Sequence, residues 1–96
     1  MRAIFRVNRS FLLSSRSLFV LAGAVAEGEV RSGMSALVPF NASTSMACHI
    51  EGVEFLRIAD TEEVALTVRY VEPDEGILLQ GLNIQSEDLI VTDEQV

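Results

Sequence analysis

The sequence predicts an all-β domain, and two observations support this fold class. Short apolar segments rich in alternating and β-branched residues recur along the chain, with turn residues about every eight to twelve positions, which is typical of a sandwich or a barrel. In addition, no long stretch shows the spacing of apolar residues that forms one face of a helix. Hydrophobic residues make up 49% of the 96 positions. We therefore expect one globular domain over residues 1–92 and an acidic tail over residues 93–96.

The first half of the chain contains three predicted strands. Ala3–Leu13 alternates apolar with polar side chains and ends at the polar turn Ser14–Ser17. Leu18–Val30 is long for a single strand, and Gly23 near its middle favours a bulge or a sharp bend. Met34–Phe40 resumes an apolar strand after a short glycine-containing turn.

The second half adds further strands. Thr44–Ala59 predicts two strand segments around Gly52. Val64–Tyr70 has the clearest alternation in the chain, with one buried and one mixed face. After an acidic turn, Ile77–Ile84 is predicted as the last substantial strand, and Leu89–Val91 as a short apolar segment before the tail.

The composition excludes several kinds of site. All seven basic residues are arginines, so the chain has no lysine for a phosphate-binding loop or a Schiff base. Cys48 and His49 are the only residues of their types, which excludes an internal disulfide and the usual zinc patterns. We expect no metal, no cofactor and no GTP. The cysteine usage fits a reducing compartment, so we expect a cytoplasmic protein.

Charge is distributed unevenly along the chain. Residues 1–26 carry four arginines and no acid, whereas all fourteen acids follow them, and the formal net charge is -7. An acidic body repels phosphate backbones, so we rank protein partners above nucleic acid. The acid-free start imitates a secretory signal that ends at Ala26, but its alternating residues favour a strand. A secreted domain released after Ala26 stays a third hypothesis, and no apolar stretch is long enough to predict a membrane span.

Four segments resemble the second domain of translational GTPases such as elongation factor Tu. They are Phe5-Arg6-Val7, the glycine-spaced stretch at 22–33, the segment 50–55, and Leu78-Leu79-Gln80-Gly81-Leu82. The resemblance covers roughly residues 3–92 and implies a small, closed or partly open Greek-key β-barrel of about six or seven strands. Gln80 and Met34 depart from the family pattern, which commonly has arginine and aspartate there.

The resemblance also implies a function. In elongation factor Tu this barrel helps to hold the aminoacylated end of transfer RNA, and Glu54 matches a glutamate close to that end, with Arg57 nearby. We therefore expect a non-enzymatic, free-standing binding module without the GTPase domain. Its expected partner is a protein or, as the second choice, an RNA end, bound through loops at the barrel rim. Pairing of strand edges between two copies predicts a homodimer as a further possibility.

Each of these sites has a simpler interpretation. Glu54 and Arg57 fit an ordinary cross-strand salt pair, and Cys48 fits a buried, inert thiol. The alternative function is a small-ligand or catalytic barrel that uses His49 with Asp60 or Glu54, which requires those side chains to converge in a pocket. No serine lies in the glycine pattern of a nucleophile elbow, so a structural or solvated histidine is favoured.

Overall fold

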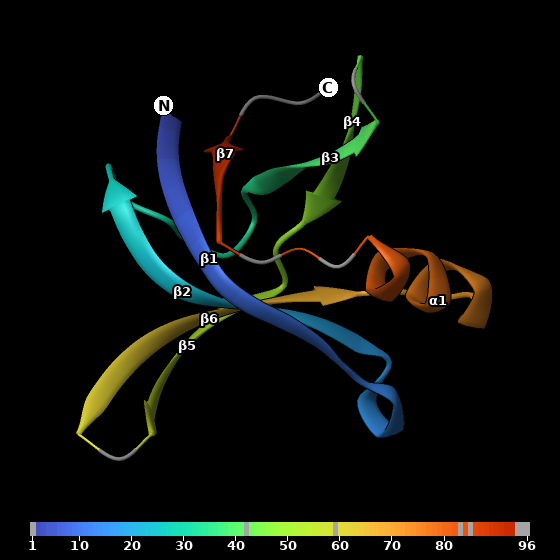
Figure 1. The fold of residues 1–96 in the computed structure, drawn as a ribbon, viewed down its shortest axis with the longest axis horizontal. Helices are drawn as coiled ribbons and strands as arrows, with labels where there is room; N and C mark the ends of the chain where they lie inside the picture. Colours follow the sequence, from blue (N-terminus) through green and yellow to red (C-terminus); the bar gives the residue numbers. More distant parts are fainter. Residues whose placement is uncertain (1, 42, 59, 83, 85, 94–96) are drawn as a thin grey trace.

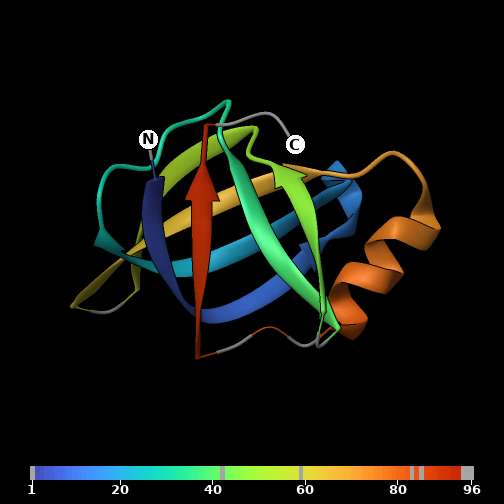
Figure 2. The same cartoon turned by 90° about the horizontal axis from the view of Figure 1, so that it is seen from above.

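The computed structural model describes residues 2–41, 43–58, 60–82, 84 and 86–93, which form one antiparallel sheet and one α-helix (Figure 1, Figure 2). The elements are β1 (Arg2–Leu13), the 3-10 turn η1 (Ser14–Arg16), β2 (Leu18–Glu27), β3 (Ser35–Asn41), β4 (Thr44–His49), β5 (Gly52–Ile58), β6 (Thr61–Arg69), α1 (Pro73–Gly81) and β7 (Glu87–Thr92). The predicted all-β class is confirmed. Residues 94–96 of the predicted tail lie outside the described residues.

The sheet has seven strands in the order β4-β3-β7-β1-β2-β6-β5, so β4 and β5 are its edge strands. It coils strongly around the core but is not closed, because β4 pairs only with β3 and β5 only with β6 among the described residues (Figure 2). The split of 44–59 into two strands around Gly52, predicted from the sequence, is confirmed.

Ile50 and Glu51 connect the two edge strands and bond to both sides of the sheet. The amide of Ile50 donates to the carbonyl of Met34 at 2.8 Å, and its own carbonyl accepts from the amide of Gly33 at 2.9 Å. The amide of Glu51 donates to the carbonyl of Thr67 at 2.8 Å. The two edges therefore meet at this link. β4, which precedes the link, pairs with β3, and β5, which comes after it, pairs with β6.

The core lies inside the coil of the sheet. Alternation turns Phe5 and Val7 of β1 inward, with exposed Arg6 between them. In β6 both faces are buried over residues 65–68, so the mixed face predicted for Val64–Tyr70 is exposed only at Arg69. The largest fully buried side chains are Phe5, Phe19, Leu21, Ile50, Leu66, Ile84 and Leu89. They come from both halves of the chain, so the strands on either side of the Ile50–Glu51 link share one core.

The helix α1 corrects one prediction, because residues 77–81 are helical and not part of a strand. Pro73 stands at the start of α1, with Asp74 and Glu75 in its first turn, and both features favour a helix N-terminus. Only Gly76 and Leu79 of α1 are buried, and a Cβ on Gly76 would lie 2.7 Å from the ring of Tyr70. A helix this short, with a glycine as half of its buried face, gives no apolar stripe to detect.

Gly23 lies where β1 and β2 approach most closely. The register between these strands shifts between Val7 and Arg9, so the bulge is opposite Gly23, and the predicted irregularity is confirmed. A Cβ added to Gly23 would lie 1.9 Å from the carbonyl oxygen of Arg6. No real side chain tolerates that distance, so the backbone of β1 would have to move.

We expect Gly23→Ala to lower the free energy of unfolding by about 3 kcal/mol, at the upper end of the cost of overpacking. The matched control is Gly81→Ala at the end of α1, where an added Cβ meets nothing within 4 Å. That change should alter stability by no more than about 1 kcal/mol. Urea denaturation followed by circular dichroism measures both, and equal stabilities of the two variants would contradict the close approach.

Candidate functional site

The hairpin formed by β5 and β6 extends from the body at the end of the molecule opposite α1 (Figure 1, Figure 2). Its strands pair in unbroken register from Gly52 opposite Thr67 to Ile58 opposite Thr61. Because β5 is an edge strand, its outer row of backbone groups is not used by another strand among the described residues. Such an edge is a template for pairing with another chain.

Phe55 is the most unusual side chain of the hairpin, because 80% of its surface is exposed. Alternation places it on the same face of β5 as Val53 and Arg57. Val53 packs against the core, whereas Phe55 lies farther out along the strand. Together with Leu56, Arg57 and Glu62 it lines a hollow of about 310 Å³. Phe55 is not among the site residues predicted from the sequence, although an arginine on the same face as apolar residues is a signal that the face leaves the core.

Polar contacts fix the hairpin to the body both at its base and, through Glu63, nearer its turn. Glu63 accepts hydrogen bonds from Arg9 at 3.0 Å and from Asn8 at 3.1 Å. Arg69 donates two hydrogen bonds to Glu51, at 2.7 and 2.9 Å, in a bidentate pair. The hydroxyl of Thr67 donates to the carbonyl of Gly52 at 3.3 Å. These contacts hold the hairpin on both sides of Phe55, so Phe55 lies on a fixed part of the strand.

The predicted site residues Glu54 and Arg57 both lie on β5, but three positions apart, and so on opposite faces of the strand. Arg57 forms a 2.7 Å ion pair with Glu62, its partner across the hairpin. Both side chains are largely exposed, so this pair contributes little stability. Glu54 is exposed and forms no ion pair with any described residue. It lines a hollow of about 370 Å³ together with Arg16 and Arg69.

The groups of the alternative catalytic site lie apart. His49 is exposed on β4 and lines a hollow beside α1 with Glu75 and Leu78, whereas Glu54 lines the hollow at the base of the hairpin. Asp60 is in the turn between β5 and β6. No described hollow contains His49 together with either carboxylate. The convergence of His49 with Glu54 or Asp60 in one pocket is therefore not seen in the described part of the chain.

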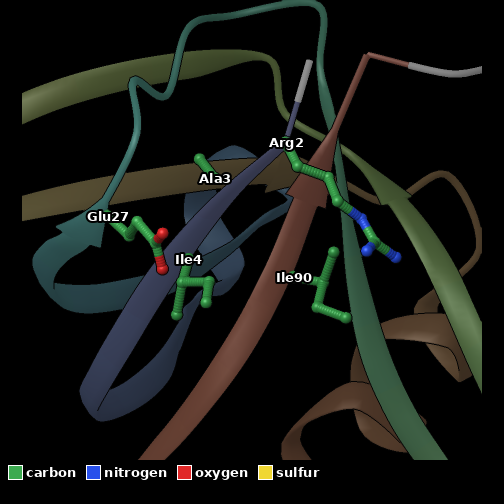
Figure 3. A pocket seen from close by; sticks show the side chains of 5 residues that line it. All are labelled: Arg2, Ala3, Ile4, Glu27 and Ile90. Atoms are coloured by element: carbon green, nitrogen blue, oxygen red, sulfur yellow. The ribbon is translucent and has the colours of Figure 1, made fainter.

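Two other surfaces carry exposed apolar side chains. On the outer face of the sheet, Ile4 and Ile90 are register partners and line a groove of about 250 Å³ with Arg2 and Glu27. Figure 3 shows that the side chain of Arg2 points away from Glu27, so the two charges do not close the groove. On α1, Ile77 is 66% exposed. Neither surface lies on an open strand edge.

Most arginines already have a carboxylate partner. Within the part of the chain that the structure describes, five of the seven form ion pairs, which are Arg6–Asp88, Arg9–Glu63, Arg31–Glu29, Arg57–Glu62 and Arg69–Glu51. These pairs leave a surplus of carboxylates, because the chain has fourteen acids and only seven arginines. Among the described residues, no group of three or more histidine, cysteine or acidic side chains is placed to hold a metal ion. The described helix is too short to cross a membrane.

No protein-family model, curated protein or solved structure matches this chain. The resemblance to the second domain of translational GTPases therefore stays a prediction. Part of the segment 78–82, which that resemblance assigns to a strand, lies in α1.

Glu51 gives the base of the hairpin a pH-dependent contact. The hydrogen bond from Arg69, helped by the charges of Arg69 and His49, holds the pKa of Glu51 below its ordinary value, although burial opposes this. A lowered pKa means that ionised Glu51 stabilises the fold above its ordinary pKa, and that this contribution is lost as the pH falls through the lowered value. The pair therefore contributes at neutral pH and not in strong acid.

We expect Arg69→Gln to reduce stability at neutral pH and to raise the pKa of Glu51 toward its ordinary value. The difference in free energy of unfolding from the wild type should shrink as the pH falls through the lowered pKa. Carboxyl NMR titration and urea denaturation at several pH values measure the two effects. Arg57→Gln, which removes an exposed guanidinium farther along the hairpin, is the control and should leave the Glu51 titration unchanged. A Glu51 pKa unaffected by Arg69→Gln would contradict the assignment.

Cys48 is buried, and burial raises the pKa of its thiol to about 11. Because the thiolate is the reactive form, we expect a disulfide reagent at pH 8 to modify Cys48 only when the protein unfolds. Absorbance of the released thiol, with and without urea, measures this. Immediate stoichiometric reaction of the folded protein would show an accessible thiol.

Proposed function

We propose that this protein is a non-enzymatic binding module, and that it binds another protein along β5. The observation that carries the proposal is the position of Phe55, a four-fifths exposed aromatic side chain on an edge strand whose outer side has no partner among the described residues. Large aromatic side chains dominate the energetics of protein interfaces. An open edge adds main-chain hydrogen bonds to a partner strand, so the two features fit one mode of recognition, strand addition.

Burial of Phe55 adds to the affinity of a protein contact at this site. Burying an exposed phenylalanine contributes about 2 kcal/mol, or about 30-fold in Kd. The hollow beside Phe55 gives an apolar side chain of the partner a place to pack, and the fixed base of the hairpin limits the entropy lost on binding.

Support for a protein rather than a nucleic acid comes from the charges. Phosphate recognition uses unpaired basic side chains, and five of the seven arginines are paired with carboxylates. The RNA-end role of Glu54 and Arg57, the translation-related process and the Greek-key barrel type rest on the resemblance alone. They are retained as predictions, together with a cytoplasmic location.

A site-specific crosslinker tests the proposed surface in cells. With a photoreactive benzoyl-phenylalanine in place of Phe55, we expect a discrete adduct with one protein, formed through an extended segment of that protein. The same group in place of Ile77, which is 66% exposed on α1, is the matched control and should give no such adduct. Mass spectrometry of the adduct identifies the partner and the crosslinked residue.

Once the partner is known, Phe55→Ser should weaken binding by about 30-fold while leaving the fold intact, because the side chain is outside the core. Ile77→Ser should leave the affinity unchanged. Adducts at position 77 alone, or crosslinking at position 55 to nucleic acid, would contradict the proposed function.

A further inference from the structure

We infer that the segment that pairs with β5 is a basic, extended strand of another protein, with a lysine or arginine facing Glu54 and an apolar side chain facing Phe55. This inference rests on the proposed function and specifies the chemistry of its partner. It follows from the two faces of β5, which differ in charge and in whether their charged side chains already have an ion-pair partner.

The first face carries a free carboxylate. Glu54 is exposed and has no ion pair with any described residue, and its cross-strand partner is Ala65. Glu63 shares this face, but its carboxylate already accepts hydrogen bonds from Arg9 and Asn8. Glu54 is therefore the acid on this face that has a charge left for a new strand.

The opposite face is apolar, with its cation already engaged. Phe55 lies between Val53 and Arg57, and the guanidinium of Arg57 is held by Glu62 at 2.7 Å. A strand added to β5 alternates its side chains in the same way, so successive residues meet these two faces in turn. Directly opposed cross-strand side chains are about 5 Å apart, close enough for charge and packing to select them. The complementary sequence therefore has a basic residue opposite Glu54, flanked by apolar residues that meet the face of Phe55.

A second copy of the chain fits this edge less well. Antiparallel pairing about a two-fold axis keeps each face on its own side, so the Glu54 residues of both copies would lie on the same face. A register that sets the two carboxylates directly opposite each other is destabilised by their like charges. Each copy also carries a net charge of -7, which adds repulsion over the whole surface. A basic partner turns both unfavourable contributions into favourable ones.

Two synthetic peptides test the inference on the intact protein. The lysine peptide is acetyl-Thr-Val-Lys-Val-Lys-Val-Thr-amide, and the glutamate peptide replaces both lysines by glutamate. Each is titrated into isotopically labelled protein, and amide NMR shifts report the binding site and the Kd. We expect the lysine peptide to shift residues of β5 and to bind at least tenfold more tightly than the glutamate peptide.

Charge reversal at one position provides the sharpest arm of this experiment. Glu54→Lys should reverse the preference, so that the glutamate peptide binds more tightly. Glu87→Lys, an equal change of net charge at an exposed position on β7, should keep the preference for the lysine peptide. Two lysine peptides N-methylated at alternate residues test the main-chain bonds. We expect one of them to lose binding and the other to keep it, because only one edge of the peptide faces β5.

Several results would overturn the inference. These are a preference insensitive to Glu54→Lys, absence of shifts in β5 with either peptide at millimolar concentration, and equal binding of both N-methylated peptides. A dimer in sedimentation analysis that Phe55→Ser dissociates would also overturn it, because the occupant of the edge would then be a second copy. That last result leaves the proposed function standing, since the partner is still a protein on β5. The proposed function fails separately, through the crosslinking result at position 55.

Discussion

The hydrogen bonds of Ile50 and Glu51 are the constraint on which the rest of the structure depends. Within two residues the chain bonds to Met34 and Gly33 on one side and to Thr67 on the other, while the side chain of Ile50 is fully buried. This link ties together two strands that stand at opposite ends of the sheet order. The coil of the sheet is thereby fixed without a hydrogen-bonded seam between β4 and β5, and one core serves both halves of the chain.

The same link produces the exposed edge. β4 pairs with β3, whereas β5 pairs with β6. β5 therefore runs outward beside β6, and no described strand lies on its other side. Contacts at the base of the hairpin prevent this edge from moving freely, most directly the bidentate pair between Arg69 and Glu51. An open edge is a liability for a soluble protein, and charged residues such as Glu54 and Arg57 on β5 limit unspecific pairing. The hairpin is thus both a stable part of the fold and the part best suited to recognition.

Much of the fold follows from alternation and glycine, whereas the candidate site does not. Phe5 and Val7 alternate with exposed residues because β1 has one inner face, and Gly23 marks the bulge because only glycine permits that approach. The pattern of apolar residues does not predict the helix α1, because the glycine on its buried face leaves no apolar stripe. Phe55 was missed because alternation shows which residues share a face, but not where along the strand that face leaves the core. That point is set by the position of the link at Ile50 and Glu51, which is a property of the tertiary structure.

The distribution of charge connects the fold to its proposed partner. Most arginines form ion pairs within the described part of the chain. Arg69 holds the base of the hairpin, Arg9 holds it nearer its turn, and Arg6 bridges β1 to β7 through Asp88. The surplus of carboxylates is then left for the surface, and Glu54 is the member of that surplus that lies on the open edge. In the proposed complex, an acidic residue next to an exposed phenylalanine favours a basic strand with an apolar face over another copy of this chain and over a phosphate backbone. The selectivity of the edge thus follows from where the fold uses its few cations.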